Sequence, residues 1–422
     1  MENLLYWIWL SLCCTPGYTT FDKLIAEFDS PERIFSATDA EISSCIGERV
    51  RDYTMLVQRD LSAAREVLDF CTRHKVGILT YADSAFPESL RTIIGSPVLL
   101  YYRGPLPDFS SLCPIAVVGS RKMSSYGQKS AFTIAADLAR AGATVVSGMA
   151  KGIDAMAMAG ALSENGRVIA FLGCGIDICY PEVHLTLARE TVKNGCIMTE
   201  YAPGTPPDRF NFPKRNRLIS GLSAATLVIE GKEQSGAMIT ARHAMAQNRP
   251  VYALPGNVDS PGSAAAHLLL RNGARLLTSA DDVVRDLESL YLGILNPFAM
   301  AASAPAEMEP VLRRLELRGA EEKGTGLLAS LFPRKSEKKK KEEPEEEIEI
   351  AKPDASAQIL ATMDADARRV YEAIPENGDC ALESLCSEAL PLRMVMKYLL
   401  KLEIKGLVTM LPGERVARTR SI

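Results

Sequence analysis

The sequence predicts an α/β protein built on an extended Rossmann-like, doubly wound sheet. Between residues 73 and 290, apolar runs alternate with amphipathic patterns such as "SYGQKSAFTIAADLARAG". This alternation is typical of a sheet with helices on both faces. Several runs are almost continuously apolar, which is typical of parallel strands buried on both sides. The expected strands are, in order, "VLLYY", "PIAVVG", "ATVVSG", "RVIAFLG", "CIMTE", "ATLVIE" and "PVYALPG".

Residues 1–72 precede this domain and predict a small helical module. The run "LLYWIWLSLCC" is too short to span a bilayer, follows Glu2 rather than a basic leader, and lacks a clear cleavage site, so we expect a buried helix. Ser30 and Thr38 are expected to cap two of the helices that follow. The pattern resembles a SAM-like or helix-hairpin-helix module. Its turn, "PGY", lacks the second glycine of a DNA-binding hairpin, so a structural or protein-contact role stays open.

Two further segments follow the sheet domain. Residues 294–356 contain Pro-Ala stretches and then "KSEKKKKEEPEEEIEI", whose opposed charge blocks have no apolar period and predict a disordered charged linker. Residues 357–422 return to a globular pattern, with three helical stretches and then a hairpin expected around Pro412 and Gly413. Three helices followed by a hairpin predict a winged-helix module.

Composition indicates that any ligand site is local. The chain has 422 residues and a formal charge of -4, so its overall balance gives no indication of nucleic-acid binding. Its ten cysteines include no Cys-x-x-Cys pair and lie in apolar runs, as expected for reduced, buried thiols in a cytoplasmic protein. Cys174, Cys179 and His184 do not have the spacing of a common zinc site. We therefore expect no metal and no other cofactor.

Three strand-to-helix turns carry the features of anion sites. Glycine lets the backbone approach a ligand, and the free N–H groups of a following helix favour a phosphate. None of the three is a Gly-x-Gly-x-x-Gly dinucleotide motif, and each also fits an ordinary turn or a capped helix. The turns contain Gly119, Ser120 and Arg121; Ser147, Gly148 and Lys151; and Ser235 and Gly236.

A fourth segment gathers positive charge beside a Phe-Pro pair, just before an expected helix "NRLISGL". Residues 209–217 hold four basic residues, no acidic residue, and two aromatic residues, Phe210 and Phe212. Cations interleaved with aromatic rings fit a single nucleic-acid strand, because the charges follow phosphates and an aromatic face takes a base. A solvated charged turn with Phe212 in the core also fits.

No catalytic motif competes strongly with a binding role. The sequence has no Gly-x-Ser-x-Gly motif, and no nucleophile motif lies near His243 or His267. Glu200 and Glu230 each end an expected strand, so both approach the same edge of the sheet. As a pair they suit glycosidic chemistry on a nucleotide. They also suit bracing of the arginines through hydrogen-bonded pairing, and we favour this second use.

Seven motifs in a fixed order carry a family resemblance over about residues 75–290. They are "VVGSRKMSSYG", "VVSGMAKGIDAMAMAGAL", "FLGCGIDICYP", "TEYAPGTPP", "FPKRNRLISGLS", "SGAMITARHA" and "LPGN". Together they resemble the DNA-processing protein A (DprA) family, also called Smf. The resemblance implies a non-enzymatic, usually dimeric protein that binds single-stranded DNA and helps to load the RecA recombinase during natural transformation. It also implies the flanking SAM-like and winged-helix modules, which members often carry.

The same resemblance assigns the site residues. The first two glycine turns, with Gly119, Ser120, Arg121, Ser147, Gly148 and Lys151, would contact backbone phosphate. The pocket would be completed by Phe212, Lys214, Arg215, Asn216 and Arg217, with Ser235 and Gly236 near its floor. Two departures concern His184 in "YPEVH" and His267 in "AAHLLL", which stand where the family usually has asparagine. Each places a titratable imidazole where a neutral amide is usual.

The sequence leaves two hypotheses of different classes. The first is a cytoplasmic, non-enzymatic binder of single-stranded DNA that acts in recombination, with no membrane partner. The second is a nucleotide phosphoribohydrolase on a related Rossmann sheet. The "PGGxGTxxE" motif of such hydrolases is missing, and "IEGKEQSGAMITA" occupies the comparable place. A scaffold that uses only its winged helix is a third possibility.

Overall fold

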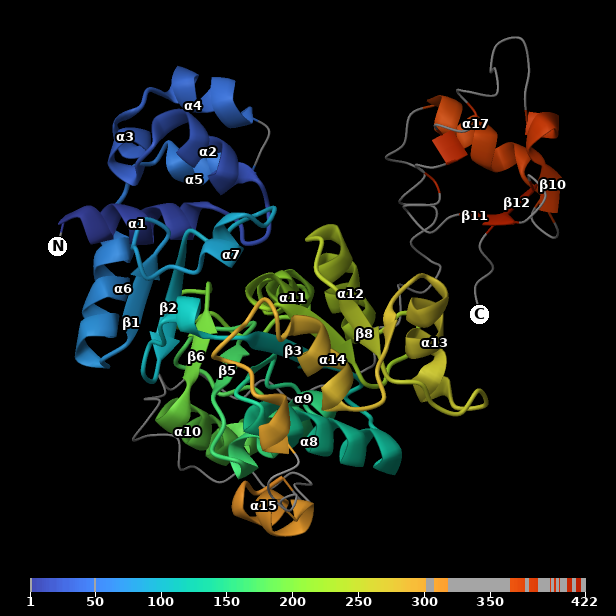
Figure 1. Cartoon of the computed structure of the whole chain (residues 1–422). Helices are drawn as coiled ribbons and strands as arrows, with labels where there is room; N and C mark the ends of the chain where they lie inside the picture. The colour runs from blue at the N-terminus through green and yellow to red at the C-terminus, as the bar shows by residue number, and fades with distance from the viewer. Residues whose placement is uncertain are drawn as a thin grey trace. The chain divides into compact units, whose positions relative to one another are not determined.

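The computed structural model describes residues 2–48, 51–300 and 307–317 and, nearer the C-terminus, residues 365–375, 379–385, 408–411 and 415–418 with four single positions, 395, 398, 399 and 402. The chain divides into two compact units, residues 1–336 and 337–422. The first contains a large sheet and the second a small one (Figure 1).

A nine-stranded sheet forms the centre of the first unit. Its strands lie in the order β1-β2-β6-β5-β4-β3-β7-β8-β9, and every neighbouring pair from β6 to β9 is parallel. β2 runs antiparallel to both β6 and β1. All seven expected strands are confirmed, whereas the edge strands β1 and β9 were missed. The strands are β1 Gly77–Thr80, β2 Leu99–Arg103, β3 Pro114–Val118, β4 Thr144–Ser147, β5 Val168–Phe171, β6 Cys196–Thr199, β7 Ala225–Val228, β8 Val251–Ala253 and β9 Arg275–Leu276.

The direction of strand addition reverses at β3. The chain moves from β3 through β4 and β5 to β6 on one side, and then returns to place β7 on the other side of β3. Because these strands are parallel, the turns that follow β3, β4 and β7 leave the same edge of the sheet. Open α/β sheets bind ligands at the carboxyl ends of strands beside such a reversal. The fold therefore brings the predicted anion turns to the expected edge.

Helices cover both faces of the sheet. Along β3, Ile115 and Val117 join the core on one face, while Ala116 and Val118 join the core on the other, so this strand is buried on both sides. Helices α8 to α10 lie against the first face, and α11 and α12 against the second (Figure 1). The predicted α/β fold is confirmed. The helices are α7 Glu88–Arg91, α8 Ser125–Arg140, α9 Ile153–Ser163, α10 Leu185–Asn194, α11 Asn211–Leu222, α12 Gly236–Ala246, α13 Ala264–Arg271 and α14 Ala280–Leu287.

Six helices precede the sheet, drawn in blue in Figure 1. The first is the expected buried helix, in which the side chains of Trp7, Ile8, Trp9 and Leu10 are all buried. Two predicted caps are confirmed, because the hydroxyl oxygens of Ser30 and Thr38 accept N–H groups of α3 and α4. The assignment to a SAM-like or helix-hairpin-helix class stays a prediction. The helices are α1 Glu2–Cys13, α2 Thr20–Phe28, α3 Pro31–Ser36, α4 Asp39–Ile46, α5 Arg51–Leu56 and α6 Ser62–Arg73.

The first part of the expected linker is helical, which corrects the sequence analysis. Helix α15, Met308–Arg314, packs on α9, and the side chains of Leu312 and Leu315 are buried. The Thr186 hydroxyl also donates to the Glu316 carboxylate at 2.7 Å. The apolar face of this segment consists of Val311, Leu312, Leu315 and Leu317, which lie among charged residues. The Pro-Ala composition of the region gave no indication of it. The charged run itself, residues 318–356, lies outside the described residues.

The second unit contains a three-stranded antiparallel sheet in the order β10-β12-β11. The two strands of the predicted hairpin are confirmed, while its turn at Pro412 and Gly413 and most of the expected third helix lie outside the described residues. Of the second expected helix, only the short 3-10 turn Leu382–Leu385 is described. The winged-helix assignment stays a prediction. The other elements are α17 Ala365–Ala373, β10 Asp379–Ala381, β11 Val408–Leu411 and β12 Arg415–Arg418.

Candidate nucleic-acid interface

The turn after β3 presents an exposed cation at the sheet edge. The Ser120 hydroxyl donates to the Lys122 carbonyl oxygen at 2.7 Å and accepts the Lys122 N–H at 3.1 Å, which shapes the turn. Arg121 is exposed, and its guanidinium carbon lies 5.3 Å from the centroid of the Phe212 ring. The Ile153 N–H donates to the Ser120 carbonyl oxygen at 3.1 Å. The first two predicted anion turns therefore adjoin each other.

The turn after β4 is arranged differently from the expectation. Ser147 is completely buried, and its hydroxyl donates to the Val117 carbonyl oxygen at 2.8 Å, so it joins β4 to β3. The Gly148 N–H donates to the Asp154 carboxylate at 3.1 Å, and the Ala150 N–H donates to the same oxygen at 3.4 Å. The N–H groups of this turn were expected to bind a phosphate, but two of them already bind the Asp154 carboxylate. Lys151, which is exposed, is the member of this turn that can reach a ligand.

Arg215 stabilises the turn after β4 from the buried side. Its side chain is buried, and its guanidinium donates to the carbonyl oxygens of Gly148, at 2.9 Å, and of Phe171. A Cβ atom on Gly148 would lie 2.6 Å from Arg215 Nη2 and 2.8 Å from the Asp154 carboxylate, so only glycine fits between them. Burial raises the pKa of Asp154, and the positive charge of Arg215 acts in the opposite direction. Arg215 therefore builds the turn and presents no free charge.

Arg217 is buried in a bidentate ion pair. Its two terminal nitrogens donate to the two Glu200 oxygens, both at 2.7 Å, and its Nε donates to the Gly95 carbonyl oxygen at 2.9 Å. The expectation that Glu200 braces a basic residue is confirmed. For Glu230 it is wrong, because that carboxylate accepts the Ser124 N–H at 2.9 Å and the Ser124 hydroxyl. Removing one partner of a buried ion pair lowers the free energy of unfolding by about 3–5 kcal/mol. Arg217 and Glu200 therefore both contribute to the stability of the fold.

Most of the basic segment, from Asn211 onward, is part of α11, although the sequence analysis placed it before the helix. Helix α11 begins at Asn211, so Lys214, Arg215 and Arg217 lie in its first two turns. The helix includes Pro213. It is tolerated as the third helical residue because the first N–H groups of a helix have no intrahelical partner. The helical period then sends Arg215 and Arg217 inward and leaves Lys214 half-buried.

Two interpretations of Phe212 were open, an aromatic face for a base and a side chain in the core, and the structure shows features of both. It is half-buried, and it lies so close to Gly173 that a Cβ atom there would be 2.7 Å from its ring. The ring stacks on Tyr180, with centroids 5.4 Å apart and planes at 30°. The Arg121 guanidinium lies over the ring as well. Phe210, in contrast, is 62% exposed, and the Arg209 guanidinium carbon lies 4.9 Å from its centroid.

The third predicted turn begins α12. Ser235 occupies the N-cap position without a side-chain bond to the helix, and its hydroxyl oxygen is buried with no hydrogen-bond partner among the described residues. Gly236 is exposed, and a Cβ atom on it would meet nothing within 4 Å. The Asn216 amide donates to the Gly236 carbonyl oxygen at 3.3 Å and accepts from Arg215 Nε at 3.2 Å. Asn216 thus links the start of α12 to the turn after β4.

The two unusual histidines both contact backbone carbonyl oxygens. His184 is buried, and its Nδ1 lies 2.9 Å from the oxygen of Met149, a residue with a φ of 57°. Burial lowers the pKa of His184. His267 Nε2 lies 3.1 Å from the Gly256 oxygen. Asp154, Arg215 and His184 therefore hold the backbone around Met149 in a conformation that is uncommon for a residue other than glycine.

The metal alternative finds no geometric support among the described residues. The thiols of Cys174 and Cys179 lie 3.5 and 3.6 Å from the carbonyl oxygens of Ile178 and Pro181, and burial raises both pKa values to about 12. No group of three or more His, Cys, Asp or Glu side chains in the described part of the chain could hold a metal ion. Within the same residues, every helix is too short or too polar to cross a bilayer.

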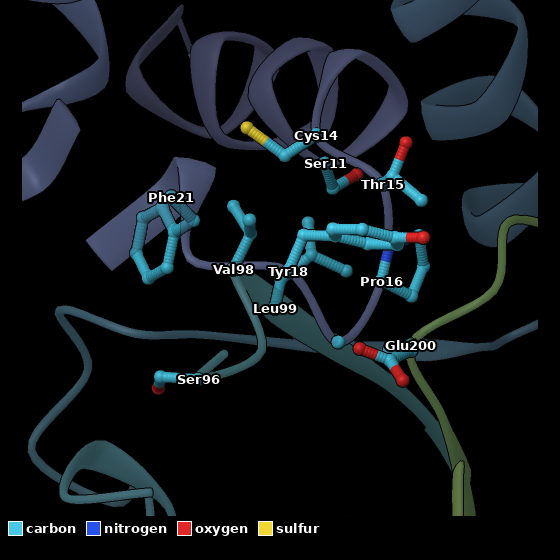
Figure 2. Close-up of a pocket in the computed structure, with 11 residues that line it drawn as sticks. Ser11, Cys14, Thr15, Pro16, Tyr18, Phe21, Ser96, Val98, Leu99 and Glu200 are labelled. Carbon is cyan, nitrogen blue, oxygen red and sulfur yellow. The ribbon is translucent and has the colours of Figure 1, made fainter. Parts of the chain in front are cut away.

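Figure 2 shows a small pocket between the N-terminal helices and the sheet. Its volume is about 10 Å³, at the lower limit for one water molecule, so it takes neither a base nor a nucleotide. Its wall includes Tyr18 and Glu200, which the sequence analysis did not connect. The lining residues are Ser11, Cys14, Thr15, Pro16, Gly17, Tyr18, Phe21, Ser96, Val98, Leu99 and Glu200.

Comparison with known proteins agrees with the fold and with the arrangement of the motifs. A family model described as DNA recombination-mediator protein A matches residues 77–288. The protein Smf of Synechocystis sp. is 30% identical over 98% of each chain. The chain belongs to the DNA recombination-mediator protein A family. The family resemblance of the seven motifs is thereby confirmed.

Two further comparisons place the chain within the DNA recombination-mediator protein A family. The DNA processing protein DprA of Streptococcus pneumoniae is 40% identical over 206 residues, which are 49% of this chain and 72% of the relative. A crystal structure of that protein superposes with a TM-score of 0.59 at 31% identity, covering 68% of this chain and 98% of the other. The segment that the family model matches contains every predicted site residue and leaves the helices α1 to α6 outside.

Proposed function

We propose that this protein binds single-stranded DNA through the carboxyl edge of its sheet and acts in DNA processing during recombination or natural transformation. The observation that carries the proposal is the exposed Arg121 guanidinium stacked over the half-buried Phe212 ring, at the reversal point of the sheet. A cation beside an aromatic face suits a phosphate and its neighbouring base. The names of the relatives, DNA processing protein DprA and Smf, support the same role.

The predicted site residues divide into contacts and supports. Among the predicted site residues, Arg121 and Lys151 are exposed and Lys214 is half-buried, and we assign these three basic side chains to phosphates. Arg215 and Arg217 are 4% and 3% exposed, so we assign them to positioning: Arg215 holds the turn at Gly148, and Arg217 anchors α11 to Glu200. The backbone of Gly119, Ser120 and Gly236 shapes the edge on either side.

Binding without catalysis is favoured over a phosphoribohydrolase. A glycosidic reaction needs one carboxyl group as acid and a second as base or nucleophile. Here the Glu200 carboxylate is fully engaged by Arg217, and the Glu230 carboxylate is engaged by Ser124. Incubation with nucleoside monophosphates should therefore release no base. Release of free base that disappears in Glu230→Gln would instead support the hydrolase.

The proposals on oligomeric state and on a recombinase partner rest on the resemblance to the DNA recombination-mediator protein A family. We propose a cytoplasmic homodimer that shelters single strands and helps to load the RecA recombinase. Sedimentation of the pure protein tests the dimer, and recombinase-driven strand exchange on protein-coated single strands tests the loading. A monomer at all concentrations, or no stimulation of strand exchange, would contradict these finer statements without affecting the DNA site.

A gel-shift comparison of labelled single strand, duplex and free nucleotide tests the central proposal. We expect a shifted single strand that excess unlabelled single strand competes away and that excess nucleotide leaves in place. Duplex should compete poorly, because its bases cannot reach an aromatic face. Equal competition by duplex would exclude base stacking, and failure to shift any DNA would exclude the proposal.

A further inference from the structure

A second group of aromatic and basic side chains adjoins the predicted site and shares only Lys214 with it. Tyr18 follows the Pro16-Gly17 turn of the N-terminal module, its side chain is 58% exposed, and Lys214 Nζ lies 5.1 Å from its ring centroid. Phe210 is 62% exposed beneath the Arg209 guanidinium. Each pair repeats the arrangement of Arg121 over Phe212. The match to the family model begins only at residue 77, so it does not include Tyr18.

The start of helix α11 contributes to both pairs. Phe210 is the N-cap residue of α11 and Lys214 lies four residues later, so the two side chains stand on the same side of the helix. Lys214 in turn contacts Tyr18 of the N-terminal module. Arg215 and Arg217 point into the core and do not join this surface. The exposed side of the first helical turns thus connects the glycine turns with the N-terminal module.

The N-terminal turn is held firmly in this place. The Asp22 carboxylate accepts the N–H groups of Gly95, at 2.8 Å, and of Ser96, at 3.1 Å. Gly95 and Gly17 approach so closely that a Cβ atom on Gly95 would lie 2.8 Å from the Gly17 carbonyl carbon. Arg217, from α11, donates to the oxygen of the same Gly95. Tyr18 is therefore positioned before a ligand arrives, which lowers the entropy lost on binding.

We infer that Tyr18 and Lys214 extend the single-strand path beyond the glycine turns, so that the N-terminal module supplies a base-stacking platform and α11 supplies a phosphate contact beside it. This inference rests on the proposed function. The base stacks on the exposed part of the Tyr18 ring, since the pocket behind the ring holds about 10 Å³.

The charges around this surface favour a nucleic-acid strand. The Glu200 carboxylate in the pocket wall is neutralised by Arg217, and the Asp22 carboxylate is turned toward two backbone N–H groups. Asp208 is exposed near Phe210 and accepts the Phe210 N–H at 2.7 Å, so it opposes a phosphate at that point. The cations Arg209 and Lys214 flank it, so two cations surround one exposed carboxylate at this point.

Fluorescence anisotropy with single strands of two lengths tests the inference. Strands of about 4 and about 16 nucleotides bracket the usual site sizes of single-strand binding folds. Tyr18→Ala should weaken binding of the long strand about fivefold or more, the loss expected for one stacked base, and leave the short strand unchanged. Tyr18→Phe, which keeps the aromatic face, should bind like the parent. Lys214→Gln should make the salt slope for the long strand shallower by about 0.7.

Two further variants separate the possible outcomes. Phe298→Ala removes an aromatic side chain that is 84% exposed on a different part of the first unit, and it should change nothing. Arg121→Ala should weaken both strands. If Arg121→Ala does so while Tyr18→Ala and Lys214→Gln bind like the parent, the Tyr18–Lys214 contact is only structural and the inference is wrong. If the parent binds neither strand, the proposed function itself fails.

Discussion

Replacing Arg215 by methionine tests whether this buried guanidinium builds the turn after β4. The change removes three hydrogen bonds, to the oxygens of Gly148 and Phe171 and to the Asn216 amide. At about 1 kcal/mol each, these account for about 3 kcal/mol. The change also leaves the Asp154 carboxylate buried without its positive neighbour. Together we expect the free energy of unfolding to fall by about 3–5 kcal/mol, the range for breaking a buried charge pair.

The effect of replacing Arg215 should depend on pH through the titration of Asp154. Without Arg215, the pKa of Asp154 in the folded protein rises further above its unfolded value of about 3.9. The loss of stability should therefore be full at neutral pH and should diminish as the pH falls, because below about 3.9 the Asp154 carboxyl is protonated in both the folded and the unfolded protein. Urea unfolding of the parent, Arg215→Met and Arg215→Met with Asp154→Asn provides the measurement. The double variant should recover part of the loss at neutral pH. Equal stability of the parent and Arg215→Met would refute the reasoning.

Three other substitutions test different contacts of the first unit. Phe212→Ala should weaken binding of single-stranded DNA by about 1–3 kcal/mol and leave duplex binding nearly unchanged, as compared by anisotropy; an equal loss for both would show that the change damaged the fold. His184→Asn should reduce the acid sensitivity of the protein, because the lowered pKa of His184 makes the parent lose stability as the pH falls below about 6.5; identical pH profiles of urea unfolding would contradict this. Leu312→Ala should lower the free energy of unfolding by about 2–5 kcal/mol, since this α15 side chain is 1% exposed; the exposed Arg314→Ala is the control.

Much of the fold could be predicted because the hydrophobic pattern determines it. Seven strands were predicted from largely apolar runs of five to seven residues. Strand β3 shows why such a run forms, because its alternate side chains lie in two different cores. The missed strand β9 is a two-residue edge with exposed side chains, so it leaves no apolar run. Helix α15 was missed because its few buried leucines stand among charges, in a region whose composition is typical of a linker.

The candidate site could be located but not resolved from sequence. Charge and glycine spacing indicated the correct edge of the sheet, where the turns at Ser120 and Gly148 adjoin. Sequence alone could not tell an exposed arginine from a buried one, because Arg121 and Arg215 have the same chemistry and differ only in tertiary surroundings. Asp154, which occupies the expected phosphate donors, lies six residues after Gly148 and gave no distinct signal. Tyr18 lies in another module, and only the fold brings it to Lys214.

The salt dependence of single-strand binding by Arg121→Ala tests the central claim most directly. Each phosphate contact to a single strand contributes about -0.7 to the slope of log affinity against log salt. Anisotropy titrations at several salt concentrations should show weaker binding and a slope shallower by about 0.7 for Arg121→Ala. Arg215→Met, compared under conditions where it remains folded, should keep the parent slope, because its buried guanidinium meets no phosphate. Parent-like affinity and slope in Arg121→Ala would place the DNA elsewhere and contradict the account.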